Sequence, residues 1–575
     1  MKEYFKLFVI IISLLLYAGL IHGKNRSDDR SPNILIILTD NQSYYELGCN
    51  GHSVVRTPNI DQFANEAVVF DHFYASPFCS PSRAEMLTGK YALRMGVHNT
   101  IGGVSIIPSS EPLLPSYLKK VGYTSGVFGK WHLGNEYPYN PLYRGFVQSF
   151  IHDGGGIGQL PDYYGNNHID AYYNSNGEIV PSNGFSTDVL FRKAKEFIEE
   201  NKDDPFFCFV STPATHAPWQ AHPEKLEELE QRGVKGDNNE MALYSMIENI
   251  DDNVGEILKY LKNSGLRENT FVIIATDQGM RYRGLSNPPP EKEFGLPDHV
   301  FDRRHHVFCM MQYPALTKSS LTVKNLAGII DISPTILDIC GISVPSAMDG
   351  KSLKPLLEGN TERWDADRSL IIQCPRQRKR EEDRNVSVKT KKWRLINGNL
   401  LFDAEKDPSQ LTDVSSLYPG VVDSLNSIYT DFWNRLPPEE KVLPRHIIGA
   451  EEMPEIRLNA MDWYKGDSPW TQGQIEKRVH QGTWAVDVVK PGRYQFELRR
   501  YPREASKPIE ANHAAIKVGD VKAKISLERF ENKAVLDMQL EKGSYDLKTF
   551  FMNESTSGNT EAWGSYFVYV KYIDK

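Results

Sequence analysis

The chain has 575 residues, of which 40% are hydrophobic and 24% are charged, a balance typical of globular proteins with sizeable cores. This length predicts roughly three or four domains. The formal net charge of −8 argues against the strongly basic surface of nucleic-acid-binding proteins, so no nucleic-acid partner is predicted.

A hydrophobic segment lies close to the N-terminus. Lys2 and Lys6 precede an apolar run at 7–21 that only Ser13 interrupts. About 15 apolar residues are short for a membrane span but suit the core of a signal peptide. We therefore predict a signal peptide at 1–23, export to the periplasm or the exterior, and no stable membrane span after cleavage. An uncleaved anchor is the alternative.

Two apolar runs far apart in the sequence each end in an aspartate. The run 33–39 leads into Asp40, and the run 271–276 leads into Asp277. Such runs are typical of central strands in a parallel sheet, whose carboxyl ends meet at one edge. Helical patterns between them, which include 186–201 and 241–264, complete an α/β order. Two carboxylates at that edge predict a cation between them, unless each aspartate merely caps the following turn.

The stretch around Cys79 combines a thiol with a predicted helix N-terminus. Ser80 as N-cap and Pro81 predict where the helix begins, and Gly89 predicts where it ends. Cys79 would then lie where unpaired amides and the helix dipole favour an anion. Arg83 adds a planar cation suited to a tetrahedral oxyanion. The hypothesis is a reactive side chain beside an anion site; a buried apolar cysteine is the alternative.

Two motifs resemble the signatures of type I sulfatases. The first reads Cys-x-Pro-Ser-Arg from Cys79 and continues to Leu-Thr-Gly at 87–89; the second reads Gly-Lys-Trp-His-Leu-Gly from Gly129. The resemblance extends over about 31–436. It implies an alkaline-phosphatase-like α/β fold built around a mostly parallel sheet, with a small C-terminal α+β subdomain.

The resemblance also implies a mechanism. A maturation enzyme would oxidise Cys79 to formylglycine, whose hydrate is the nucleophile, and Ca²⁺ would neutralise the sulfate oxygens. Lys130 would hold a sulfate oxygen, His132 would remove a proton from the hydrate, and His216 would be the general acid. The implied catalytic residues are Cys79, Arg83, Lys130, His132 and His216. The implied metal ligands are Asp40, Asn41, Cys79, Asp277 and Gln278.

The sequence departs from the family pattern at three places. Asn41 stands where the family usually has Asp, and Gln278 stands where it often has Asn or His, so the ligands supply less charge. The lysine expected before the strand that ends in Tyr-Pro at 313–314 is not at its usual spacing. Lys292 or His299 could substitute, and His299 is the candidate substrate-binding residue.

Two further segments, at 152–158 and 376–384, are predicted to be loops. The glycine-rich segment 152–158 does not open a helix, so it is predicted to be a flexible loop near the site rather than a dinucleotide-binding loop. The charged run 376–384 is interpreted as a solvated loop.

The cysteines are not expected to form a disulfide framework, because five, an odd number, remain once Cys79 is set apart. A single isolated disulfide is the alternative. The cysteines are Cys49, Cys79, Cys208, Cys309, Cys340 and Cys374.

From about residue 450 the pattern changes to short alternating strands, which predict a β-sandwich. It could bind glycans, line the pocket or act only as a packed appendage. Trp463, Trp470 and Trp484 could be sugar platforms, but we favour core positions. The predicted segments are the signal peptide at 1–23, the catalytic α/β domain at 31–385, the small subdomain at 386–445 and the accessory β domain at 450–575.

The predicted function is hydrolysis of a sulfate ester on a sulfated small molecule or, by preference, a glycan. One alternative is a phosphatase or phosphonate-ester hydrolase with the same fold. The other is a non-catalytic glycan-binding protein in which Cys79 stays unmodified.

Overall fold

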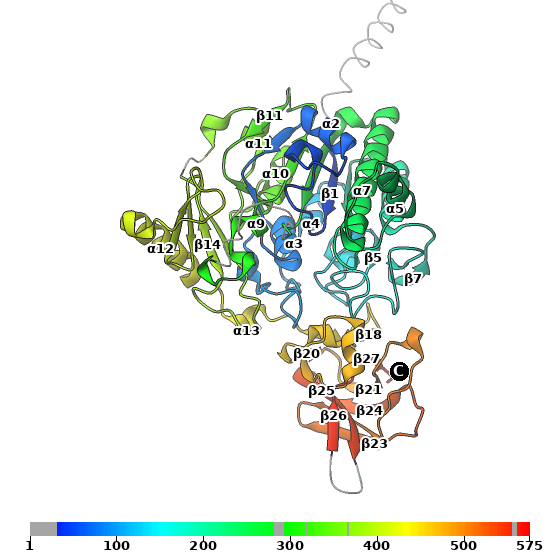
Figure 1. The fold of residues 1–575 in the computed structure, drawn as a ribbon. Coiled ribbons are helices and arrows are strands. Elements are labelled where there is room, and N and C mark those ends of the chain that lie inside the picture. The colour runs from blue at the N-terminus through cyan, green and yellow to red at the C-terminus, as the bar shows by residue number, and fades with distance from the viewer. Residues whose placement is uncertain (1–30, 281–292, 318, 365–366, 555–559, 575) are drawn as a thin grey trace, which may run out of the picture.

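The computed structural model describes residues 31–280, 293–317, 319–364, 367–554 and 560–574. A large α/β body carries a smaller sheet on one side and a β-rich C-terminal part at one end (Figure 1). The predicted signal peptide at 1–23 lies outside the described residues. Among the described helices, none has both the length and the hydropathy needed to cross a bilayer.

A ten-stranded sheet forms the centre of the α/β body, in the order β11-β2-β10-β9-β1-β8-β4-β5-β6-β7. The five strands from β9 to β5 are parallel, whereas β10, β6 and β7 pair in the antiparallel sense. The strands are β1 (Asn33–Thr39), β2 (Val68–Phe70), β4 (Thr124–Lys130), β5 (Gln148–His152), β6 (Tyr172–Ser175), β7 (Glu178–Pro181), β8 (Phe206–Ser211), β9 (Thr270–Thr276), β10 (Cys309–Gln312) and β11 (Leu321–Val323). The strands predicted at 33–39 and 271–276 are therefore confirmed.

Helices cover both faces of this sheet, and its central strands β1 and β9 are therefore buried at every position. Ile34 and Ile36 of β1 pack with one helix layer, and Leu35 and Ile37 pack with the other. The first layer contains α3 (Cys79–Thr88), α4 (Leu114–Lys119), α10 (Ile332–Ile339) and α11 (Lys354–Leu357), and the second contains α2 (Pro58–Glu66), α5 (Ser186–Glu200) and α7 (Asn238–Asn263). Helices α5 and α7 correspond to the predicted patterns at 186–201 and 241–264. Two further helices of this body are α6 (Pro223–Gln231) and α9 (Asp302–His305).

Helix α3 differs from the prediction at its first turn. It begins at Cys79 with Phe78 at the N-cap position, and no side chain caps it. The prediction of Ser80 as N-cap is wrong because the Ser80 hydroxyl donates a long-range hydrogen bond, 3.0 Å in length, to the carbonyl oxygen of His132. Gly89 ends the helix in the left-handed region at φ 66°, as predicted.

The smaller sheet is antiparallel and packs against α12 (Pro419–Asn434). Its strands are β13 (Leu370–Gln373), β14 (Val386–Lys389), β15 (Trp393–Ile396) and β16 (Leu400–Asp403). A short helix, α13 (Glu439–Val442), follows before the C-terminal part. The boundaries proposed between domains stay predictions.

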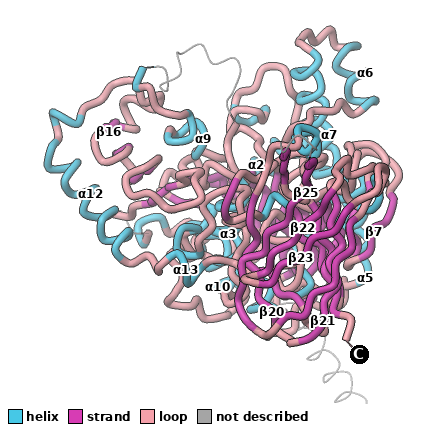
Figure 2. The backbone as a smooth tube through the Cα atoms, turned by 90° about the horizontal axis from the view of Figure 1, so that it is seen from below, coloured by secondary structure: helices cyan, strands magenta, loops and turns pink. Residues whose placement is uncertain are grey.

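The C-terminal part contains two β-sheets that share one core (Figure 2). One sheet has the order β17-β20-β25-β22-β23 and the other β18-β27-β21-β24, while β19 and β26 extend the first. The strands are β17 (His446–Ile448), β18 (Glu455–Asn459), β19 (Lys465–Gly466), β20 (Gly482–Val488), β21 (Gly492–Arg499), β22 (His513–Val518), β23 (Val521–Ser526), β24 (Ala534–Leu540), β25 (Gly543–Glu554), β26 (Thr560–Trp563) and β27 (Phe567–Tyr572). Trp463 and Trp484 are fully buried in this core, which confirms that interpretation for these two, whereas Trp470 is only partly buried.

Candidate active site

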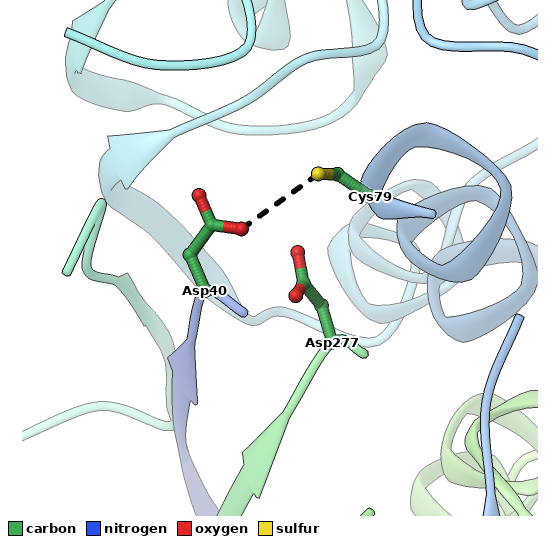
Figure 3. A group of neighbouring side chains, drawn as sticks. All are labelled: Asp40, Cys79 and Asp277. Atoms are coloured by element: carbon green, nitrogen blue, oxygen red, sulfur yellow. Dashed lines mark hydrogen bonds between the residues drawn. The ribbon is translucent and has the colours of Figure 1, made fainter. Parts of the chain in front are cut away.

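The carboxyl ends of the parallel strands bring the predicted residues together. Asp40 follows β1, Asp277 follows β9 and Lys130 ends β4. Cys79 faces them from the start of α3, with its Sγ 3.7 Å from Asp40 Oδ1 (Figure 3). Single ligand atoms from Asp40, Cys79 and Asp277 lie within 4.8 Å of one another. These three residues form what we call the strand-end cluster.

Buried cations hold both carboxylates of the strand-end cluster. Lys130 Nζ lies 2.6 Å from Asp40 Oδ2, and Arg83 contacts Asp277 Oδ2 through Nε at 3.0 Å and Nη2 at 2.9 Å. Arg83 also donates a hydrogen bond of 2.9 Å to the Lys130 carbonyl oxygen. These contacts fix each cation on its carboxylate and fix the Arg83 guanidinium on the backbone of Lys130.

The two carboxylates have opposite pKa shifts. Burial disfavours the charged form of Asp40, but the charges of Lys130, His216 and Arg83 outweigh it and lower the pKa to about 2. Burial and the negative charge of Asp40 raise the pKa of Asp277 to about 6. Two carboxylates that oppose each other's ionisation in one buried site favour a cation between them.

Asn41 and Gln278 extend the strand-end cluster with amide groups. Asn41 has a left-handed backbone at φ 61°, and its amide N–H donates a 3.2 Å hydrogen bond to Asp277 Oδ1. Gln278 Nε2 donates to Asn41 Oδ1 and, at 3.0 Å, to Cys79 Sγ. Gln278 Oε1 is buried without a hydrogen-bond partner among the described residues. Because a terminal amide can be turned over, this set offers carboxylate and amide oxygens, the donors that Ca²⁺ prefers.

The Cys79 thiol is poorly suited to act as a nucleophile itself. The residue is only 4% exposed. Burial raises the pKa of the thiol to about 12, although Lys130 opposes the shift. The reactive form of cysteine is the thiolate, so the thiol is inert at neutral pH.

His132 is a neutral imidazole with one free nitrogen. Its Nε2 lies 3.0 Å from the carbonyl oxygen of Thr100, which can only accept, so Nε2 carries the proton. Its Nδ1 is buried without a partner in the described part of the chain. Burial and the charge of Lys130 hold the pKa of His132 well below its usual value. His132 can therefore accept a proton at Nδ1.

The glycine-rich loop predicted to lie near the site packs directly on both histidines. A Cβ on Gly155 would lie 2.1 Å from Cε1 of His132, and one on Gly156 would lie 3.2 Å from Nδ1 of His216. His216 Nδ1 is 2.5 Å from the Ala217 carbonyl oxygen, so in the neutral ring this nitrogen carries the proton and Nε2 does not. Burial lowers the pKa of His216, and the charge of Asp40 opposes that shift.

A family model covers the part of the chain that contains the strand-end cluster. The sulfatase family model matches residues 32–342, more than half of the chain. The chain belongs to the sulfatase family. A second model, for the C-terminal region of N-sulphoglucosamine sulphohydrolase, matches residues 293–431.

Individual relatives are more distant. The chain is 33% identical to human N-acetylgalactosamine-6-sulfatase over 364 residues, which are 57% of this chain and 66% of that protein, just under two thirds of its length. The solved structure of Ps i-CgsB has a TM-score of 0.62 at 24% identity and covers 71% of this chain and 94% of its own. The phosphonate monoester hydrolase of Agrobacterium radiobacter has a TM-score of 0.51 at 20% identity, with 71% and 96% covered. At these identities the two structures show the fold alone.

The residue that replaces the expected family lysine stays a prediction, and the structure brings an arginine to the residues just before Cys79. Lys292 lies outside the described residues. His299 lies 5.1 Å from the Phe78 ring, and burial lowers the pKa of His299 to about 4, so it is neutral. Arg304 of α9 lies nearby, with Nη2 3.4 Å from the Pro77 carbonyl oxygen. Sequence reasoning missed Arg304 because nothing in the pair Arg303-Arg304 tells which side chain faces the site.

The interpretation of 376–384 as a solvated loop is wrong for Arg378 and Arg380, which are partly buried, whereas Arg376 is exposed as predicted. Arg376 packs over the rings of Phe78 and Trp470. Arg378 donates hydrogen bonds to the Trp463 carbonyl oxygen and, at 3.1 Å, to Ser468 Oγ. Segments next to β19 in the C-terminal part supply the Trp470 ring and these acceptors, which a charge pattern alone does not reveal. Lys379 and residues 381–384 are exposed, as predicted.

The cysteines fit the prediction of no disulfide framework. All six are free in the structure.

Proposed function

We propose that this chain hydrolyses sulfate esters on carbohydrates to give an alcohol and inorganic sulfate. The observation that carries the proposal is the strand-end cluster, in which two buried carboxylates and Cys79 lie against Lys130 and Arg83 in a chain of the sulfatase family. The preference for a carbohydrate is supported by the N-acetylgalactosamine-6-sulfatase relative.

The proposal includes Ca²⁺, formylglycine and export. Asp40, Asn41, Asp277 and Gln278 would hold the ion, together with residue 79. When present, Ca²⁺ would neutralise sulfate oxygens and the hydrate of formylglycine would supply an oxygen nucleophile. The raised pKa of the Cys79 thiol argues against the thiol itself as nucleophile and so favours its role as the precursor that a maturation enzyme converts.

The chain's own residues bind the sulfate and move protons. Lys130 uses one N–H on Asp40 and keeps two for a sulfate oxygen. Arg83 fixes Asp277 and the backbone of Lys130 and so keeps the cationic wall in place. His132 would accept at Nδ1 a proton from the hydrate of residue 79. His216, once protonated at Nε2, donates that proton to the leaving oxygen, a role worth about 10²–10⁴-fold in rate.

The test compares two matched substrates. Full-length protein made in a host with the maturation enzyme is assayed on an aryl sulfate and on the corresponding aryl phosphate, and on N-acetylgalactosamine 6-sulfate. We expect sulfate release to dominate and to extend to the sugar. Dominant phosphate release would support the phosphatase alternative instead, and binding of the sugar without any hydrolysis would support the glycan-binding alternative.

A further inference from the structure

Arg376 stacks on two aromatic rings beside the candidate active site. Its guanidinium carbon lies 4.5 Å from the ring centre of Phe78, the residue before Cys79, and 5.7 Å from that of Trp470. The residue is exposed and has a left-handed backbone at φ 52°. Stacking on two rings orders the guanidinium and leaves its edge with N–H donors free for an anion.

The charge of Arg376 has no carboxylate partner among the described residues. Other arginines of the same loop do: Arg380 Nε lies 3.6 Å from Glu439, and Arg384 Nη1 lies 3.0 Å from Glu381. Arg376 is therefore held by rings, whereas these neighbours are neutralised by acids. A cation that is ordered but not neutralised can bind an anionic ligand without first losing a protein partner.

A second guanidinium lies beside the same Phe78 ring. The Arg304 guanidinium carbon is 5.9 Å from the Phe78 ring centre, and its Nε is buried without a hydrogen-bond partner among the described residues. Burial lowers the pKa of Arg304, Asp298 and Cys79 oppose the shift, and the positive charge of Arg376 adds to it. Two like charges that act on each other across one aromatic ring favour an anion near both.

The C-terminal part holds Trp470 against the α/β body through main-chain contacts. The Trp470 carbonyl oxygen accepts a 3.0 Å hydrogen bond from the amide N–H of Leu160, and Thr471 forms a β-bridge with Gln159. Gln159 in turn accepts a 2.9 Å hydrogen bond from the Gly155 amide, in the loop that packs on His132. The segment that carries the Trp470 ring is thus bonded to the loop that packs on His132.

We propose that Phe78, Arg304, Arg376 and Trp470 form an entrance subsite that binds a second anionic group, a sulfate or a carboxylate, on the saccharide that carries the scissile sulfate. The proposal rests on the proposed function, because it assigns the second anion to the substrate of that site. A planar guanidinium pairs with either oxyanion through two parallel N–H donors, so the chemistry is shared by both sources. The substrate class is then a multiply anionic saccharide.

The first experiment measures a preference ratio. Values of kcat/KM are determined for N-acetylgalactosamine 6-sulfate, its 4,6-disulfate, and a disaccharide that links a uronic acid to the 6-sulfate. We expect the wild-type chain to prefer a doubly charged substrate. In Arg376→Gln that preference should fall by about 10- to 100-fold, the range of one charge-assisted hydrogen bond. A loss of preference for the disulfate identifies sulfate as the second anion, and a loss for the uronic acid disaccharide identifies carboxylate.

A matched control uses the same loop. Lys379→Gln removes one exposed positive charge three residues away and should leave the preference ratio at its wild-type value. Arg376→Lys should retain only part of the preference, because an ammonium lacks the planar pair of donors. No preference in the wild-type chain, or an unchanged ratio in Arg376→Gln, overturns the proposal. An equal loss in Lys379→Gln also overturns it, since the effect would then be the field of the whole loop.

A binding measurement separates this proposal from the proposed function. Calorimetry with the full chain compares the Kd of the disulfate and of the uronic acid disaccharide between wild type and Arg376→Gln. At least a tenfold weaker Kd in the variant for one of them supports the entrance subsite even if no sulfate is released, and in that case only the proposed function fails. Equal Kd values for both overturn the subsite even if sulfate release is fast.

Discussion

The strand-end cluster and the entrance subsite handle charge in opposite ways. In the cluster, Asp40 and Asp277 are fully buried, and each has a buried cation within 3.0 Å. In the entrance subsite, Arg304 and Arg376 lie against rings and have no carboxylate within ion-pair distance among the described residues. The cluster therefore holds its carboxylates and cations in fixed positions away from solvent. The entrance subsite keeps cations available for a ligand.

The comparison predicts a steep order of mutational effects. Changes in the strand-end cluster should remove the reaction, whereas changes at the entrance subsite should alter which substrate is preferred.

The largest effect is expected for Cys79→Ala. Sulfate release should fall below detection because the precursor of the nucleophile is gone, while the unfolding temperature should stay close to that of the wild type. Sulfate release and thermal unfolding are measured in parallel, with exposed Cys49→Ser as the control. Sustained release by Cys79→Ala would place the nucleophile elsewhere.

Removal of Ca²⁺ comes next. A chelator should abolish sulfate release, and added Ca²⁺ should restore it and raise the unfolding temperature, because a ligand at 100 times its Kd stabilises the folded state by about 2.7 kcal/mol. In Asp277→Asn the rise in unfolding temperature on addition of Ca²⁺ should be smaller, since one charged ligand is lost. In the control Asp423→Asn, at an exposed position of α12, the rise should be that of the wild type. Equal shifts in both variants would show that the ion binds outside the cluster.

A smaller loss is expected for Gly155→Ala. The added methyl group would meet the His132 ring at 2.1 Å, so the ring must move and kcat should fall by about 10²-fold, with little change in KM. Steady-state kinetics check the prediction. Gly473→Ala is the control, because a Cβ there meets nothing within 4 Å. An unchanged kcat in Gly155→Ala would remove His132 from proton transfer.

The smallest effect is expected for Trp470→Ala at the entrance subsite. The loss of one of the two rings under Arg376 should lower the preference for the doubly charged substrate by roughly 3- to 10-fold. Trp470→Phe, which keeps a ring, should retain most of it. If Trp470→Ala leaves the preference for the doubly charged substrate unchanged, the C-terminal part does not contribute to the entrance subsite.

The strand-end cluster was accessible from the sequence because regular structure places it. The apolar runs before Asp40 and Asp277 fix two strands, and parallel strands end at a common edge, so their convergence follows from local pattern alone. Helix α3 follows the same logic, apart from Ser80, whose hydroxyl is taken by a carbonyl group 52 residues away.

The entrance subsite was not accessible in this way. Phe78, Arg304, Arg376 and Trp470 come from four distant segments, and no spacing links them. Arg376 was interpreted as part of a solvated loop because its charge pattern is the same whether or not a ring lies beneath it. Only tertiary packing distinguishes it from Arg384, which pairs with an acid of its own loop.

The most direct test of the central claim is the mass of the peptide that contains residue 79, taken from full-length protein made in its native host. The account predicts formylglycine at this position, in protein that releases sulfate. An unmodified cysteine in protein that still releases sulfate would contradict it.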